Sequence, residues 1–304
     1  MTRIALVVTD PEFYANDPDP DTPLILDSLT SDGTPAEMVV WHDPDVDWSA
    51  YDLAVLRSPW DYPLRPAEFD QWLQHVAPLT RVLNEPHMVR WNMDKHYLDD
   101  LASAGITVVP TSYHRSAESV ADALARAAQA GDAARADGAA HVVVKPTVGS
   151  GSRLAGLFRA DDPAAQQLAE AIIADGAAAM IQPEVPELSE GLEKAVYMVN
   201  GEFTHAIAKG ALLARGGGMI GGIYGENAQV VEVTDDEKAF VGKVLEAVMK
   251  VNDSEMPLYA RIDIVDTARY GKVLLEAELI EPLLNLRHAP GVEHVFAAAI
   301  RARG

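Results

Sequence analysis

The chain has 304 residues, and its 46 Asp and Glu residues against 24 Lys and Arg residues give a formal net charge of −22. A surface this acidic offers no broad basic face to nucleic acid or to an anionic membrane. An anionic ligand must therefore be bound by a few focused cations, backbone N–H groups or metal ions. The absence of cysteine excludes disulfides, thiol catalysis and cysteine-ligated zinc. With no secretory signal and no apolar run near ~18 residues, we expect a cytoplasmic protein without nucleic-acid or membrane partners.

The first third of the chain alternates continuous apolar runs with segments of helical spacing, which is typical of an α/β domain built on a parallel sheet. Ligands of such sheets bind beyond the carboxyl ends of the strands. Arg57, Trp60 and Asp61 follow the third run, so they are candidate substrate contacts, with an exposed turn as the alternative. The expected strands are Ile4–Val8, Glu37–Trp41 and Leu53–Leu56, and the expected helices are Pro23–Leu29 and Pro66–Val76.

The remainder of the chain predicts a mixed α+β region. Its strands follow one another too closely for βαβ units throughout. The expected helices are Trp91–Ala104, Ser116–Ala130, Pro163–Ala174, Asp235–Val251 and Gly291–Ala302. The expected strands are Ile106–Tyr113, Val142–Val144, Arg153–Phe158, Ala178–Ile181, Ala195–Val199, Phe203–Ala208, Leu258–Val265 and Val273–Ile280.

The strongest chemical signal lies on the last two expected strands. Arg261 and Asp263 alternate on one strand, and Glu276 and Glu278 alternate on the next. If these strands pair in antiparallel fashion, three carboxylates and one guanidinium converge. Buried carboxylates that share one face resist ionisation unless a cation lies among them, and their hard oxygens suit Mg²⁺ or Mn²⁺. The sequence therefore predicts a metal site, with a solvent-facing polar sheet as the alternative.

Two lysines lie where they could meet phosphates. Lys145 ends an apolar strand and precedes a small-residue loop containing Gly149, Ser150 and Gly151, whose free N–H groups suit an anion. This is no P-loop, because the lysine precedes the glycines, and a surface hairpin is the alternative. Lys95 is expected in the first turn of a helix capped by Asn92 or Asp94, where a cation opposes the helix dipole. A phosphate contact would explain that position, and a solvated lysine is the alternative.

Two further segments carry weaker signals. The run Gln182, Pro183, Glu184 and Val185 leads from a strand into a proline-broken hinge that can offer backbone groups to a purine edge. A following carboxylate, among Glu187, Glu190 and Glu193, can accept from ribose hydroxyls. An acidic linker is the alternative. Lys209 precedes a glycine-rich loop that contains Arg215 and Gly217, for which a disordered surface loop is the alternative.

In chain order, these motifs resemble the ATP-grasp superfamily of carboxylate–amine ligases. The resemblance covers roughly residues 89–304 and implies a Rossmann-like pre-ATP-grasp domain at 1–88, a central subdomain at 89–184 and a C-terminal subdomain at 185–304, with nucleotide bound between the last two. It implies that Lys95, Lys145 and the loop Gly149–Gly151 contact the ATP phosphates, that residues 182–185 hold adenine, and that Glu193 or Glu190 holds ribose. Asp263, Glu276 and Glu278 would bind two Mg²⁺ ions.

The same resemblance implies the chemistry. Arg261, Lys145 and Lys209 would act in phosphoryl transfer from ATP to a substrate carboxylate, after which an amine displaces the phosphate. Arg57, Trp60, Asp61, Arg215 and Gly217 would contact a small, amino-acid-derived substrate. A homodimer is compatible with this assignment.

The pattern departs from the dipeptide ligases of the superfamily in two places. Glu278 stands where asparagine is usual, and residues 279–283 replace a small, glycine-containing turn. Segments 57–62, 90–98 and 275–286 instead resemble the ATP-grasp cyclo-ligases of D-cycloserine biosynthesis. This narrower resemblance implies ring closure of O-ureido-D-serine by its own nitrogen. An intermolecular dipeptide-type ligase and a non-catalytic nucleotide-binding protein remain the alternatives.

Overall fold

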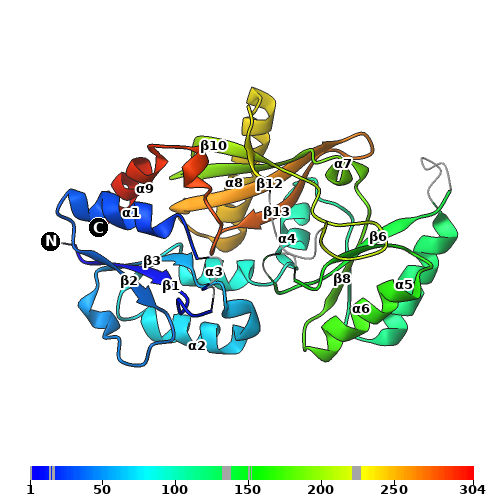
Figure 1. The fold of residues 1–304 in the computed structure, drawn as a ribbon, viewed down its shortest axis with the longest axis horizontal. Coiled ribbons are helices and arrows are strands. Elements are labelled where there is room, and N and C mark those ends of the chain that lie inside the picture. The colour runs from blue at the N-terminus through cyan, green and yellow to red at the C-terminus, as the bar shows by residue number, and fades with distance from the viewer. Residues whose placement is uncertain are drawn as a thin grey trace.

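The computed structural model describes residues 2–13, 15, 18–131, 138–149, 151, 153–220 and 227–304. Three sheets organise these residues, with strand orders β2-β1-β3-β4, β5-β8-β6-β7 and β11-β10-β9-β12-β13. The first sheet lies within residues 4–83, the second within 112–183 and the third within 193–278. Their arrangement can be followed in Figure 1.

The first sheet is parallel, as its apolar runs predict. Because both of its faces are buried, its strands are apolar throughout. Helix α2 covers one face with Phe69, Trp72 and Leu73, while α1 and α9 cover the other (Figure 1). The elements of this region are β1 (Ile4–Val8), α1 (Thr22–Ser31), β2 (Ala36–Val40), β3 (Leu53–Ser58), α2 (Pro66–Val76), β4 (Arg81–Leu83) and, from the far end of the chain, α9 (Val292–Arg301).

The second sheet is antiparallel and is covered by α5 and α6. It forms the lobe on the right of Figure 1. Ser116 caps α5 by accepting a hydrogen bond from the N–H of Ser119. Its elements are β5 (Ser112–His114), α5 (Ala117–Ala130), β6 (His141–Pro146), β7 (Gly156–Arg159), α6 (Pro163–Ala174) and β8 (Ala179–Pro183).

The third sheet is antiparallel and has two different faces. Ala260, Ile262 and Ile264 pack with α8, whereas Tyr259 on the opposite face joins the core that the third sheet shares with the first sheet, α1 and α9. Arg261 and Asp263 continue the face of Tyr259 because side chains alternate along a strand. The elements are α7 (Pro186–Ser189), β9 (Glu193–Val199), β10 (Glu202–Lys209), β11 (Gln229–Val230), α8 (Asp235–Asn252), β12 (Tyr259–Thr267) and β13 (Gly271–Glu278).

Two predicted elements are wrong in extent. The single helix expected over Trp91–Ala104 is two helices, α3 (Pro86–Asn92) and α4 (Tyr97–Ser103). Asn92 caps neither helix, because its amide donates to the carbonyl of Ala277 and accepts from the N–H of Leu279. Lys95 therefore lies in the break between the helices, where its backbone N–H bonds the carbonyl of Thr147 at 2.8 Å.

The strand expected over Ile106–Tyr113 shrinks to β5 because its first half pairs elsewhere. The N–H of Leu274 on β13 donates to the carbonyl of Thr107 at 2.9 Å, so this half joins the third sheet instead of the second.

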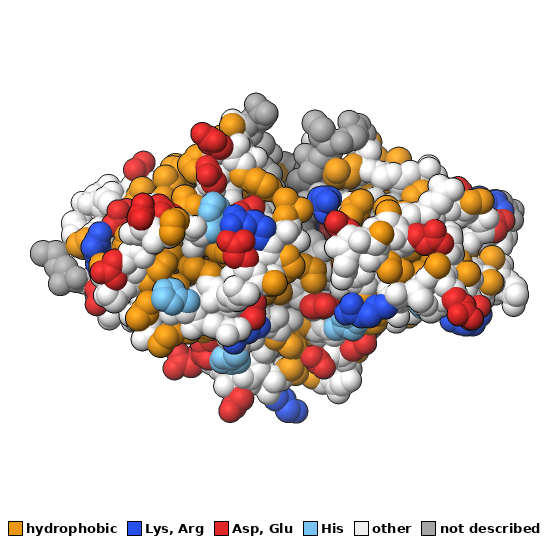
Figure 2. Space-filling view, turned by 90° about the horizontal axis from the view of Figure 1, so that it is seen from below, with side chains coloured by type: hydrophobic (Ala, Val, Ile, Leu, Met, Phe, Trp, Pro, Cys, Tyr) orange, Lys and Arg blue, Asp and Glu red, His pale blue; other side chains and the backbone are white. Residues whose placement is uncertain are grey.

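Acidic and basic side chains lie interspersed on the face shown in Figure 2. Within the described part of the chain, no helix combines the length and the apolar character that a membrane span requires.

Candidate active site

A cavity of about 1060 Å³ is lined by residues from all three sheets. The first sheet contributes the loop after β3, the second contributes the ends of β6 and β8, and the third contributes its polar face. The predicted site residues in its wall are Trp60, Lys95, Lys145, Gly149, Gly151, Gln182, Pro183, Glu184, Val185, Glu193, Lys209, Arg261, Asp263, Glu276 and Glu278.

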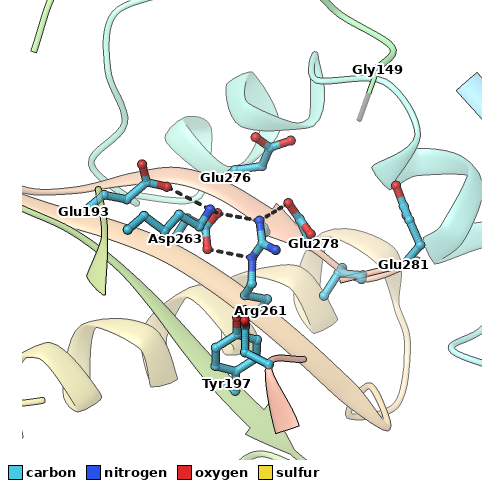
Figure 3. A network of polar contacts seen from close by, with 12 residues as sticks. Gly149, Glu193, Tyr197, Arg261, Asp263, Glu276, Glu278 and Glu281 are labelled. Carbon is cyan, nitrogen blue, oxygen red and sulfur yellow. Dashed lines mark hydrogen bonds and ion pairs between the residues drawn. The ribbon is translucent and has the colours of Figure 1, made fainter. Parts of the chain in front are cut away.

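The floor of the cavity is the pair of strands β12 and β13. Their antiparallel pairing is confirmed: Arg261 is opposite Glu278, and Asp263 is opposite Glu276. The Arg261 guanidinium donates to both carboxylate oxygens of Asp263 at 3.0 Å and also to Glu278. Figure 3 shows this arginine between the two carboxylates. The guanidinium is 4% exposed, so it acts as a fixed charge with little freedom to leave the floor.

Two lysines complete a network of alternating charge. Lys209 Nζ lies 2.5 Å from Asp263 Oδ2 and 3.0 Å from Glu193 Oε1. Lys95 Nζ lies 2.8 Å from Glu276 Oε1 and donates to the carbonyl of Gly149 at 3.0 Å. The last contact ties the predicted phosphate lysine to the glycine loop, although the two are more than fifty positions apart.

The environment shifts the pKa values of the two glutamates of β13, Glu276 and Glu278, in opposite directions. Burial would raise the pKa of Glu276, but the nearby ammonium groups of Lys95, Lys145 and Lys209 outweigh it and lower that pKa to about 2. Burial raises the pKa of Glu278 to about 8. The Arg261 guanidinium lowers this pKa, but the negative charges of Asp263 and Glu276 raise it again. Glu276 is therefore a permanent anion, whereas Glu278 needs a further cation to ionise fully.

Lys145 supplies the least compensated cation of the site. Burial lowers its pKa, and Lys95 and Lys209 add like charge, so its own surroundings do not stabilise the ammonium. Across residues for which side chains are described, no carboxylate lies within ion-pair distance of its Nζ. A bound anion would supply the negative charge that the Lys145 ammonium lacks.

The expected hinge follows β8. Gln182 Nε2 donates to Thr111 Oγ1 at 2.9 Å, and the N–H of Glu184 donates to the carbonyl of His141. The Glu184 carboxylate accepts a hydrogen bond from Arg215 Nε at 3.2 Å. Arg215 therefore stabilises the hinge, although it is not among the residues that line the cavity. Gln182, Glu184 and Val185 therefore line the cavity from a segment held at several points.

Some predicted residues are not brought to the cavity. Arg57 is 1% exposed and donates to the carbonyl of Pro282, and Asp61 accepts from Trp41 Nε1 at 2.7 Å. Gly217 accepts from the N–H of Leu157 behind the wall, and Glu190 is an exposed residue at the end of α7. Ser150 lies outside the described residues.

Several cavity residues carry no signal that the motifs detect. Glu281 and Tyr62 lie together in the wall, and burial raises the pKa of Glu281 to about 7. Asn285, Arg287 and His288 follow in the same segment. The only sequence signal here is the unusual stretch after Glu278, because the partners of these residues are distant in the chain.

Mg²⁺ fits the donors present when it arrives with phosphate. Glu276 and Glu278 line the cavity from β13, and the charge repulsion on Glu278 is of the kind that a cation relieves. Among residues whose positions are described, no group of three or more His, Asp or Glu side chains is placed to hold a metal alone. Mg²⁺ commonly takes one or two carboxylates and completes its shell with substrate phosphates and water.

Comparison with known proteins agrees with this geometry. Residues 4–84 match the family described as D-cycloserine synthetase DcsG, N-terminal domain. The cycloserine biosynthesis protein DcsG of Streptomyces lavendulae is 34% identical over 288 residues, which is 94% of each chain. The crystal structure of D-cycloserine synthetase DcsG superposes with a TM-score of 0.87 at 31% identity, covering 99% of both chains.

A more distant structure shares only the fold. The ATP-grasp ligase PsnB, complexed with its precursor peptide PsnA2 and AMPPNP, gives a TM-score of 0.62 at 15% identity over 100% of this chain and 98% of that chain. Three sheets around a cavity of lysines, arginine and carboxylates thus have the ATP-grasp fold, as the motifs predict. Within that class, the chain belongs to the D-cycloserine synthetase DcsG family.

Proposed function

We propose that this enzyme uses ATP to phosphorylate the carboxylate of O-ureido-D-serine and then closes the ring of D-cycloserine. The observation that carries the proposal is the network of Arg261, Lys209, Lys95 and three carboxylates on the cavity floor. A carboxylate is a poor electrophile, and phosphorylation supplies a leaving group. The protein contributes positioning and charge neutralisation, which are the main needs of phosphoryl transfer.

The nucleotide is assigned to the end of the cavity formed by the hinge and the lysines. We assign adenine to the backbone groups of residues 182–185, which line the cavity. Glu193 lines the cavity whereas Glu190 does not, so we assign the ribose hydroxyls to Glu193. Lys95, Lys145 and the loop around Gly149 are assigned to the phosphates, because they present cationic and N–H groups to the same space.

The reacting carboxylate is assigned to the floor, next to Arg261. Its guanidinium would bind charge on the transferred phosphoryl group, and Lys209 would hold Asp263 and Glu193 in place. We propose that Glu276, Glu278 and Asp263 would bind two Mg²⁺ ions, or Mn²⁺ in their place. Bound there, the metal would neutralise charge on the phosphates. The glycine loop and Trp60 would restrict water, which otherwise hydrolyses an acylphosphate.

Ring closure needs only one organic substrate. The nitrogen attached to the side-chain oxygen attacks the activated carbonyl, phosphate leaves, and a five-membered isoxazolidinone forms. One water molecule then cleaves the carbamoyl group from the ring nitrogen, and the resulting carbamic acid decomposes to CO₂ and NH₃. Such an intramolecular attack gains an effective molarity of up to ~10⁵ M or more. The enzyme then needs no second amine pocket, in keeping with the replacement of the dipeptide-ligase turn after Glu278.

The test is ADP formation by the purified enzyme with ATP, Mg²⁺ and O-ureido-D-serine alone, with the product identified by its mass. We expect saturable ADP release that does not depend on an added amine. Turnover that appears only after a second amino acid is supplied would establish the dipeptide-type ligase instead. Absence of substrate-dependent ADP under either condition would leave a nucleotide-binding protein.

A further inference from the structure

Glu281 differs from the other acidic side chains that line the cavity. The others each lie within 4.0 Å of a lysine or arginine: they are Asp175, Glu184, Glu193, Asp263, Glu276 and Glu278, paired with Arg153, Arg215, Lys209, Arg261 or Lys95. Within the described ranges, no protein cation lies that close to Glu281. The cavity therefore contains one carboxylate whose charge the protein leaves for something else to balance.

The polar neighbour of Glu281 is a neutral group. Burial next to Glu281 raises the pKa of the Tyr62 phenol well above its ordinary value, so the hydroxyl stays protonated and can donate to the carboxylate. Such a donor would occupy only one of about four acceptor positions on a carboxylate. The remaining positions are available to a ligand with several N–H donors.

The backbone around Glu281 is held from both sides before any ligand arrives. Trp60 Nε1 donates to the carbonyl of Glu281 at 3.0 Å, Arg57 donates to the carbonyl of Pro282 at 3.1 Å, and Tyr259 Oη donates to the carbonyl of Ile280 at 2.6 Å. These contacts give Arg57 a role although it does not reach the cavity. A carboxylate held this way loses little freedom on binding, which favours affinity.

Glu281 also lies at the end of the floor opposite Glu193. In Figure 3, Glu193 lies at one end of the network, Arg261 and Glu278 lie in the middle, and Glu281 lies at the other end. With ribose at Glu193 and the reacting carboxylate at Arg261, the space beside Glu281 belongs to the organic substrate.

We propose that Glu281, which lies next to Tyr62 in the cavity wall, binds the α-ammonium group of the amino-acid-derived substrate. This inference rests on the proposed function, and it adds how the enzyme selects an amino acid over other carboxylic acids. The α-amino group takes no part in ring closure, so an ion pair with it serves orientation. That ion pair would set the carboxylate of the same carbon atom toward Arg261.

The test compares two ligands and three proteins. The ligands are O-ureido-D-serine and its des-amino analogue, 3-(ureidooxy)propionate, and the proteins are the wild type, Glu281→Gln and the surface control Glu246→Gln on α8. We expect the wild type to show a KM about 10- to 100-fold higher for the analogue, the range that the loss of one charge-assisted contact produces. Glu281→Gln should raise the KM for O-ureido-D-serine by a similar factor, while the KM values for the analogue and for ATP stay nearly unchanged.

Four results would overturn the inference. A wild type that does not discriminate against the analogue would do so even if Glu281→Gln failed to fold. A variant that raised the KM for both ligands, or for ATP, equally would show a structural role. Absence of ADP release by the wild type would overturn the proposed function and this inference with it, whereas normal turnover with unchanged discrimination in the variant would overturn this inference alone.

Discussion

The carboxylate of Asp21 accepts a hydrogen bond from the backbone N–H of Leu286 at 2.9 Å, across 265 positions of sequence. It also accepts from the N–H groups of Leu284 at 2.7 Å and Asn285 at 2.9 Å. Asp21 is the N-cap residue of α1, yet its side chain makes no bond within that helix. The first helix thus fixes the segment that carries Glu281 into the cavity.

We predict that Asp21→Ala lowers both stability and substrate affinity. Asp21 is fully buried, and its removal leaves buried N–H groups without acceptors, at about 1–3 kcal/mol each. Urea unfolding should show a clearly lower midpoint, and the KM for the organic substrate should rise more than that for ATP. An unchanged midpoint would show that the segment is held by its other contacts alone.

Glu276→Gln should abolish turnover while the fold remains. Its pKa of about 2 keeps the carboxylate charged at every working pH, so the site depends on that charge to hold Lys95 and a divalent ion. We expect ADP release to fall by about 100-fold or more, the scale of a lost electrostatic contact in a transition state. Circular dichroism should be unchanged, and Glu118→Gln on the surface of α5 is the control. Wild-type rates at ordinary Mg²⁺ would refute the metal assignment.

Lys145→Ala should weaken ATP binding by about 10- to 100-fold and leave adenosine binding nearly unchanged, because its ammonium is expected to meet phosphate. Calorimetric titration with the two ligands measures the difference, and Lys243→Ala on the exposed face of α8 is the matched control. Equal losses for both ligands would indicate a structural lysine.

Glu278 should make stability fall as the pH rises. Its folded pKa of about 8 lies above its ordinary value of 4.5, so between these values the folded protein holds a proton that the unfolded chain has released. The stabilisation is present below pH 4.5 and is lost by pH 8, with a total of at most roughly 5 kcal/mol. Urea unfolding at pH 5 and pH 8.5 should show this loss in the wild type and a smaller one in Glu278→Gln. Parallel behaviour of the two proteins would contradict the shift.

The sequence predicted the cavity floor because its chemistry is local. Arg261 and Asp263 alternate within one strand, Glu276 and Glu278 within the next, and a short turn leaves antiparallel pairing as the simple arrangement. The parallel first sheet could also be predicted from the sequence, since its strands are continuous apolar runs.

What the sequence did not predict depends on contacts between distant segments. Asn92 was expected to cap a helix, but its side-chain amide donates a hydrogen bond to the carbonyl of Ala277 on β13, 185 positions away. No role was predicted for Glu281, because its position depends on residues distant in the sequence. Trp60 binds its carbonyl, Asp21 holds the segment that follows it, and Tyr62 lies next to its carboxylate. Helical spacing over Trp91–Ala104 likewise could not reveal the break at Lys95, which the carbonyl of Thr147 stabilises.

The packing of α9 against the first sheet has a consequence for protein synthesis. Ile4, Leu6 and Val55 share one core with Leu29 of α1 and with Phe296 and Ile300 of α9. Helix α1 is made early, so the part of this face that α9 covers is buried only by residues made much later. At ~5–20 residues per second, roughly 10–40 s separate translation of β4 from that of α9. During that interval the nascent chain presents an apolar surface that a chaperone has to shield. Residues 4–84 expressed alone would keep that surface exposed and would aggregate.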